Sequence, residues 1–120
     1  MRFTIDHEAS DPPFEQVRRQ VTNAVADGTL APGTRMPTVR ALADELHLAV
    51  NTVAKAYRAL ETDQVVETRG RAGTFIAAQG DPVARQAQHA ALAFADRMHH
   101  LGVARDEALR LAKSALDAPR

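Results

Sequence analysis

Residues 38–60 read TVRALADELHLAVNTVAKAYRAL and contain two short runs with helical periodicity. Thr38 is a good N-cap for the first run, because its hydroxyl can accept a hydrogen bond from a free backbone amide of the first turn. Asn51 could cap the second run in the same way. Two short helices joined by the four residues 47–50 are typical of a helix-turn-helix. The apolar positions expected to face the core are Val39, Leu42, Ala43 and Leu46 in the first helix and Val53, Ala56, Tyr57 and Leu60 in the second.

A further helix is expected upstream of this pair. Asp11, followed by two prolines, can cap and open it, because a proline in the first helical turn sacrifices no bonded amide. Gly28 is placed to end the helix. The segment 29–37 carries two turn signals and is predicted to be a loop. The apolar residues that recur at helical spacing are Phe14, Val17, Val21, Ala24 and Val25.

A β-hairpin is expected downstream of the pair. The segments 65–68 and 74–77 are rich in β-branched and aromatic residues, which favour strands. Between them lies the basic, glycine-bearing tip Arg69-Gly70-Arg71-Ala72-Gly73. Three helices followed by a hairpin predict a winged helix-turn-helix. In that fold the third helix enters the DNA major groove and the hairpin flanks it.

The remainder of the chain is expected to form two helices. Asp81 is a suitable N-cap for a long helix that Pro82 would open, and Gly102 is placed to stop it. A last helix is expected over 104–116. The apolar stripe of the long helix could pack within the chain, against a second copy, or both. Because two helices bury little surface by themselves, we expect a dimer interface formed by Val83, Ala87, Ala90, Phe94, Met98, Leu101 and Leu111.

The fold class is therefore predicted to be mainly α with a small β-hairpin. Its N-terminal winged helix-turn-helix would serve as a DNA-binding domain over residues 1–79. A C-terminal two-helix hairpin would serve as a short dimerisation domain over residues 80–120.

Composition limits the other functions that the chain could have. The 15 basic and 15 acidic residues give no net charge, so composition alone does not point to nucleic acid. Absence of cysteine excludes disulfides and thiolate catalysis. No apolar run is long enough for a membrane span, and the first ten residues lack the apolar core of a signal peptide, so we expect a cytoplasmic protein. We expect no metal site at His89, His99 and His100, no cofactor and no enzymatic activity.

The chain resembles the GntR family of transcription regulators, and within it the YtrA subfamily. The resemblance covers about two thirds of the chain. Two departures stand out: many members have Ser-Arg where this chain has Ala49-Val50, and a glycine where it has Gln64. The matching stretches are 13–17, 28–33, 36–43, 51–57, 60–61 and 70–76.

The resemblance implies a set of DNA-contacting residues. Arg40 would contact the DNA backbone or a nearby base, Asn51 and Thr52 would lie at the recognition position, and Arg71 would lie near the minor groove. Further basic residues beside these elements suit phosphate contacts. The complete predicted set is Arg35, Thr38, Arg40, Asn51, Thr52, Lys55, Arg69, Gly70, Arg71 and Gly73.

The implied function is that of a sequence-specific transcriptional regulator, a repressor, that binds double-stranded operator DNA as a homodimer. A small-molecule effector, unidentified, is an additional partner to be considered. The rival interpretation is a winged helix that binds another protein instead of specific DNA. Salt dependence separates the two, because phosphate contacts weaken steeply with salt and an apolar docking surface does not.

Overall fold

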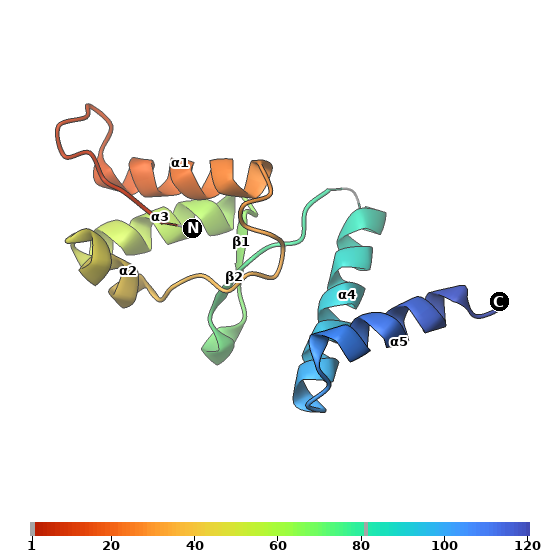
Figure 1. Cartoon of the computed structure of the whole chain (residues 1–120). Helices are drawn as coiled ribbons and strands as arrows, with labels where there is room; N and C mark the ends of the chain where they lie inside the picture. Colours follow the sequence, from red (N-terminus) through yellow and green to blue (C-terminus); the bar gives the residue numbers. More distant parts are fainter. Residues whose placement is uncertain (1, 81) are drawn as a thin grey trace. The chain divides into compact units, whose positions relative to one another are not determined.

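The computed structural model describes residues 2–80 and 82–120, which divide into two compact units, Met1–Gln79 and Gly80–Arg120 (Figure 1). Among these residues, no helix combines the length and the apolar character needed to cross a bilayer. The mainly helical class with one small hairpin is confirmed. The first unit contains α1 (Pro13–Ala26), α2 (Val39–Leu46), α3 (Val50–Thr62), β1 (Val66–Thr68), a 3-10 turn (Gly70–Ala72) and β2 (Thr74–Ile76), and the second contains α4 (Pro82–His100) and α5 (Arg105–Asp117).

The start of α2 is capped as predicted, but the start of α3 is not. Thr38 Oγ1 accepts a hydrogen bond from the Ala41 amide at 3.1 Å. The N-cap of α3 is Ala49, whose side chain makes no capping bond, and Asn51 lies inside the first turn. The prediction that Asn51 caps α3 was therefore wrong. His47, with a left-handed φ of 56°, ends α2, and the extended residue before α3 is Ala49, so the first turn of α3 already contains Asn51.

The predicted cap of α1 was also wrong. Pro12 is the N-cap of α1, and no side chain caps this helix. The Asp11 carboxylate instead binds the Arg19 guanidinium at 2.8 Å, because Arg19 lies on the exposed side of the same helix. The end of α1 agrees with the prediction, since Gly28 has a left-handed φ of 83° just after the C-cap.

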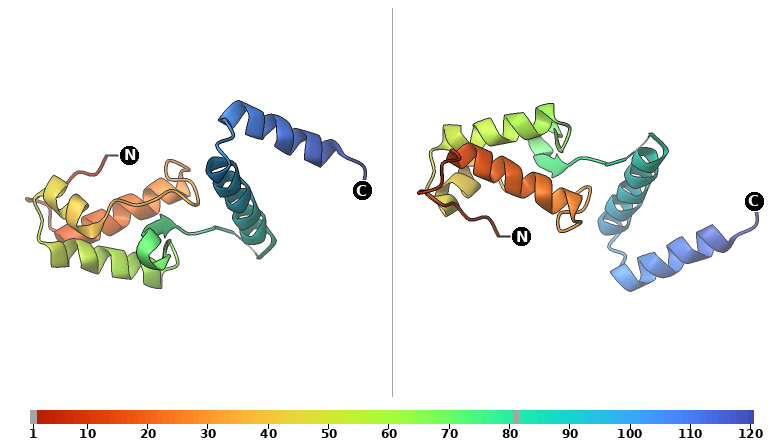
Figure 2. Two further views of the ribbon diagram at one scale, coloured as in Figure 1. Left: turned by 90° about the horizontal axis from the view of Figure 1, so that it is seen from below. Right: turned by 90° about the horizontal axis from the view of Figure 1, so that it is seen from above.

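The core of the first unit is built around α3, which contacts α1, α2 and β1. Figures 1 and 2 show α1 and α3 lying side by side. All four residues predicted to line the inner face of α3 are buried. The largest fully buried side chains of the unit come from α1, α2, α3 and β2: Val17, Val21, Leu42, Val53, Leu60 and Ile76.

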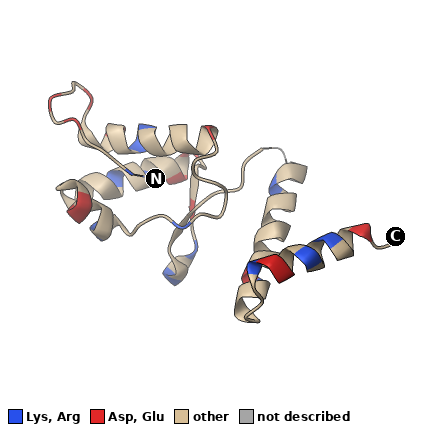
Figure 3. Ribbon diagram, viewed as in Figure 1, with Lys and Arg blue, Asp and Glu red and all other residues tan. Residues whose placement is uncertain are grey.

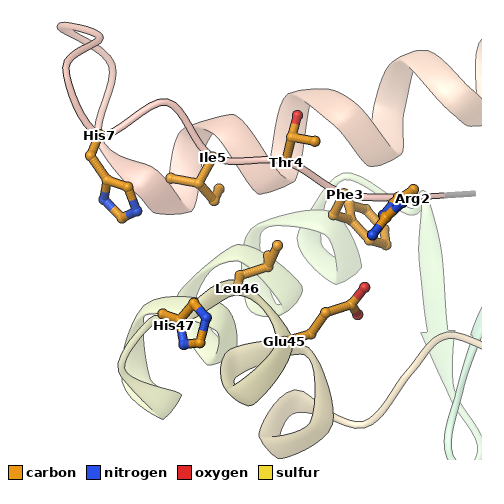
Figure 4. Close-up of a pocket in the computed structure, with 8 residues that line it drawn as sticks. All are labelled: Arg2, Phe3, Thr4, Ile5, His7, Glu45, Leu46 and His47. Atoms are coloured by element: carbon orange, nitrogen blue, oxygen red, sulfur yellow. The ribbon is translucent and has the colours of Figure 1, made fainter.

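An extended N-terminal segment, which the sequence did not predict, completes this core. Phe3 is buried, and two glutamine side chains of α1 hold the segment's backbone. Gln20 pairs with the amide and carbonyl of Thr4 at 3.0 and 2.6 Å, and Gln16 pairs with those of Asp6 at 2.8 and 2.9 Å. Figure 4 shows the open pocket between this segment and the C-terminal end of α2.

The hairpin pairs in register, with Val66 opposite Ile76, Glu67 opposite Phe75 and Thr68 opposite Thr74. Residues 33–36, which belong to the segment predicted to be only a loop, lie along the other side of β2 as a third extended segment. Arg35 forms an isolated bridge with Phe75, and the Met36 amide donates to the Thr74 carbonyl at 2.8 Å. The sequence of this segment predicts turns and does not reveal the pairing, because the partner strand lies some forty residues away in sequence.

The second unit has no buried residue among those that the structure describes. Gly102, with a left-handed φ of 71°, follows the end of α4 as predicted. Asp81, the predicted N-cap of α4, lies outside the described residues. The large apolar side chains left exposed in this unit are Val83, Phe94, Leu101, Leu109, Leu111 and Leu116.

Gln64 is strained in the turn between α3 and β1. Its φ of 61° is left-handed, and its amide donates to the Glu61 carbonyl at 3.0 Å. Glycine adopts this conformation without the penalty of about 1–2 kcal/mol that a Cβ brings, but loses more entropy on folding. We expect Gln64→Gly to raise the free energy of unfolding by about 0.5–1 kcal/mol in urea titrations.

Gln64→Ala is the matched control, because alanine keeps the Cβ and removes the rest of the same exposed side chain. Gln64→Ala should not raise the free energy of unfolding. A Gln64→Gly protein no more stable than the Gln64→Ala protein would contradict a strained turn.

Candidate nucleic-acid interface

The first two turns of α3 bring together three of the predicted residues. Asn51 and Lys55 are exposed and Thr52 is half-buried, while the opposite face of the helix packs into the core. The three line an open groove with the Pro12-Pro13-Phe14 stretch at the start of α1. Lys55 Nζ lies 3.9 Å from the centre of the Phe14 ring, so an aromatic face steadies this cation. Phe14 was predicted only as an apolar helix position, and its contact with Lys55 had no signal in the sequence.

The start of α2 is tied to α3 by a buried hydroxyl. Tyr57 of α3 donates a hydrogen bond from its hydroxyl to the Pro37 carbonyl at 2.7 Å. Burial raises the pKa of Tyr57, which keeps this group protonated and able to donate. The bond fixes the loop just before Thr38 and Arg40. This bond therefore helps to fix the start of α2 relative to α3.

The tip of the hairpin presents Arg71 on a tight turn. Gly70 and Gly73 flank it with left-handed φ values of 55° and 116°. A Cβ at Gly73 would lie only 3.2 Å from Nε of Arg35, so glycine lets this guanidinium lie against the turn. Arg35 and Arg71, both exposed, are thus held at the same hairpin.

Arg69 differs from the other predicted DNA contacts. Its Nη2 and Nε atoms donate to Oε1 of Glu67 at 2.7 and 3.0 Å. Its guanidinium carbon lies 4.3 Å from the centre of the Phe75 ring. Arg69 is therefore already bound by an acid and an aromatic ring of the hairpin itself. Sequence reasoning missed Glu67 and Phe75 as partners, although Glu67 lies only two residues before Arg69.

The cations of the first unit, whose positions Figure 3 shows, differ in whether an acid is paired with them. On α1, Arg18 binds Glu15 and Arg19 binds Asp11. The hydrogen bond from Arg18 holds the pKa of Glu15 below its ordinary value, and the same bond raises the pKa of Arg18. Within the described part of the chain, no ion pair joins an acid to the predicted contacts Arg35, Arg40, Lys55 and Arg71.

This distribution explains how a chain with no net charge can present a cationic surface. Acids neutralise the arginines of α1, where no contact was predicted. Arg40, Lys55 and, at the hairpin tip, Arg71 have no acidic partner among the described residues. An arrangement of exposed guanidinium, ammonium, amide and hydroxyl groups on these elements can bind phosphates and the edges of bases.

Comparison with known proteins agrees with this geometry. The family model described as bacterial regulatory proteins, gntR family, matches residues 13–76. The chain is 47% identical over 106 residues to the HTH-type transcriptional regulator Rv1152 of Mycobacterium tuberculosis, a match that covers 88% of this chain and 87% of that protein. It is 42% identical over 73 residues to the HTH-type transcriptional repressor YtrA of Bacillus subtilis, a match that covers 60% of this chain and only 55% of YtrA.

Solved structures show the same fold. A transcriptional antiterminator from Listeria monocytogenes superposes with a TM-score of 0.65 at 30% identity, over 98% of this chain and 91% of that one. The DNA-binding domain of AraR in complex with its operator ORX1 superposes with a TM-score of 0.55 over 62% of this chain and 94% of that one. At 22% identity, the AraR likeness concerns the fold alone. From the family match and the relatives together, the chain belongs to the GntR family of bacterial regulatory proteins.

Proposed function

We propose that the protein is a transcriptional regulator that binds a twofold operator in double-stranded DNA as a homodimer and represses by occlusion. The observation that carries this proposal is the set of exposed cations without an acidic partner, among the described residues, at the starts of α2 and α3 and at the hairpin tip. Membership of the GntR family and the names of the relatives support the same conclusion.

In this proposal the N-terminal end of α3 enters the major groove. Asn51 and Thr52 face base edges there, because amide and hydroxyl groups can read donors and acceptors. Arg40 and Lys55 bind phosphates on either side and supply affinity without sequence information. Thr38, one residue before α2, and Arg35 are further backbone contacts. Arg71, between Gly70 and Gly73, reaches toward the minor groove.

The two units have separate tasks. Residues 1–79 form the DNA-binding domain, and residues 80–120 form the dimerisation domain. Supporting this division, the second unit leaves large apolar side chains exposed and has no buried described residue with which to stabilise itself. The proposed interface consists of Val83, Ala87, Ala90, Phe94, Met98, Leu101 and Leu111.

A homodimer suits operator recognition. A twofold protein reads two half-sites about one helical turn apart, or a multiple of it, which multiplies its discrimination. A change in the angle between the two DNA-binding domains would alter that spacing, and a small effector bound at the dimer interface could cause it. We propose a cytoplasmic site of action, and no enzymatic step is required.

The test is fluorescence anisotropy of the full chain with DNA from upstream of its own gene and with a scrambled duplex, at two salt concentrations. Arg40→Ala should weaken binding to both duplexes about tenfold or more, because a hydrogen bond to a charged group contributes about 1.5–3 kcal/mol. Arg40→Ala should also reduce the slope of log affinity against log salt concentration by about one per subunit, as expected for one lost phosphate contact.

Arg19→Ala is the matched control. It removes the same charge from α1, where Asp11 already neutralises the arginine. Its affinity should stay near that of the wild type. An affinity that changes with neither the salt concentration nor the DNA sequence would contradict operator recognition and favour a protein-binding role.

A further inference from the structure

The outer face of the hairpin carries a cluster of side chains from three neighbouring extended segments. Its members are Arg35, Glu67, Arg69 and Phe75. Phe75 of β2 pairs with Glu67 of β1 on one side and with Arg35 on the other. Residues paired directly across strands point to the same face. Arg69 is the residue after β1, and its contacts with the Glu67 carboxylate and the Phe75 ring place its side chain on that face. The opposite face carries Val66 and Ile76, both buried, so the cluster faces away from the core.

Within the cluster, Arg69 is held on two sides. Two of its guanidinium nitrogens donate to one carboxylate oxygen of Glu67, at 2.7 and 3.0 Å. The guanidinium carbon of Arg69 lies 4.3 Å from the centre of the Phe75 ring. Both charged side chains are about one third exposed, at 35% for Arg69 and 36% for Glu67. Arg71, two residues further on, is exposed and has no such partner among the described residues.

We propose that Glu67 is a positioning residue that clamps Arg69 onto Phe75, so that Arg69 shapes the hairpin and does not neutralise a DNA phosphate. Arg71 is then the phosphate contact of the hairpin, and Glu67 limits the affinity of the wing for DNA. This inference rests on the DNA-binding function proposed above and concerns how the wing contributes to it.

The electrostatic argument concerns counterions. A cation that neutralises a phosphate releases a condensed counterion, so each contact steepens the fall of affinity with salt, by about 0.9 in the logarithmic slope. An Arg69–Glu67 pair carries no net charge and releases none. Replacing Glu67 by the isosteric glutamine unmasks the Arg69 charge beside the DNA and adds one such contact per subunit.

The experiment is a double-mutant cycle with Glu67→Gln, Arg69→Ala and both together in the full chain, measured by anisotropy on the upstream duplex from about 50 to 200 mM salt. Glu67→Gln should bind more tightly at low salt. Its advantage over the wild type should shrink by roughly threefold per subunit across that range, as the slope of one extra contact requires. Arg69→Ala should leave the slope unchanged, whereas Arg71→Ala should reduce it by about one.

The double variant decides whether Glu67 acts through Arg69. If it does, the steeper salt slope of Glu67→Gln is absent in the Arg69→Ala background, because no masked cation is left there to release a counterion. An equal steepening in both backgrounds would show an effect of charge that does not pass through Arg69 and would overturn the proposal. So would a loss of affinity in Glu67→Gln, or a slope reduced by Arg69→Ala. Glu61→Gln is the matched control, since Glu61 accepts from the Thr68 hydroxyl and forms no ion pair with an arginine among the described residues.

A second measurement needs no DNA. In nitrogen-edited NMR spectra, the Nε proton of Arg69 should exchange slowly with water in the wild type and faster in Glu67→Gln. Fast exchange in the wild type would overturn the clamp whatever the DNA result. A protected Arg69 in a protein that binds no duplex would instead show that the proposed function failed while the clamp exists.

Discussion

Phe94→Asp is expected to turn the proposed dimer into a monomer and to weaken operator binding by roughly 100-fold or more. Phe94 lies in the middle of the predicted stripe on α4, and it lines an apolar groove with Met98 of α4, Val103 and Ala108. In the proposed dimer, a carboxylate there would have to leave water for a groove lined mostly by apolar side chains. Loss of the second half-site then removes the roughly 10²–10⁴-fold gain that linking two binding modules provides.

Sedimentation and anisotropy on the same samples check this prediction. His89→Asp is the control, because position 89 is exposed and lies about 140° round the helix from Phe94. It should remain dimeric and keep its affinity. A Phe94→Asp protein that stays dimeric would place the interface elsewhere. A monomer that binds the operator as tightly as the wild type would show that operator binding does not depend on dimerisation.

Leu60→Ala is expected to lower the free energy of unfolding of the first unit by about 2–5 kcal/mol, the usual range for a leucine deleted from a packed core. Leu60 is completely buried near the end of α3, and its carbonyl accepts the Val65 amide at 2.9 Å where the chain enters the hairpin. Small domains have only about 5–15 kcal/mol of stability in total. The loss would therefore be a large part of it.

Urea or thermal unfolding followed by circular dichroism measures this change. Val50→Ala, in the first turn of the same helix, is the control because Val50 is 41% exposed. It should change the stability by less than about 0.5 kcal/mol. A Leu60→Ala variant as stable as Val50→Ala would contradict a tightly packed centre around α3.

The helices were predictable because their signals are local. The apolar positions that recur every three or four residues in α1, α2 and α3 are those that the structure buries or half-buries. Thr38 and Gly28 were assigned correctly because each acts on its own few neighbours in the chain. Asp11 and Asn51 were not, because a residue able to cap a helix does so only when the helix begins immediately after it.

The candidate DNA contacts were predicted as a group from the family resemblance. The structure adds which of them have other partners. Lys55 rests on Phe14, and Arg69 is held by Glu67 and Phe75. The two contacts with aromatic rings have no recognisable spacing, because Phe14 and Lys55 belong to different helices and Phe75 belongs to the other strand of the hairpin.

The sequence by itself therefore determined the order and type of the elements, the winged helix-turn-helix class and the candidate cations, because periodicity, capping and turn residues act over a few neighbours. Only the tertiary structure decided that residues 33–36 pair with β2, that the N-terminal segment joins the core through Gln16 and Gln20, and which cations are paired with acids. Ion pairing and strand pairing depend on distances of a few ångströms between segments remote in sequence. Those distances are set when the core around α3 packs.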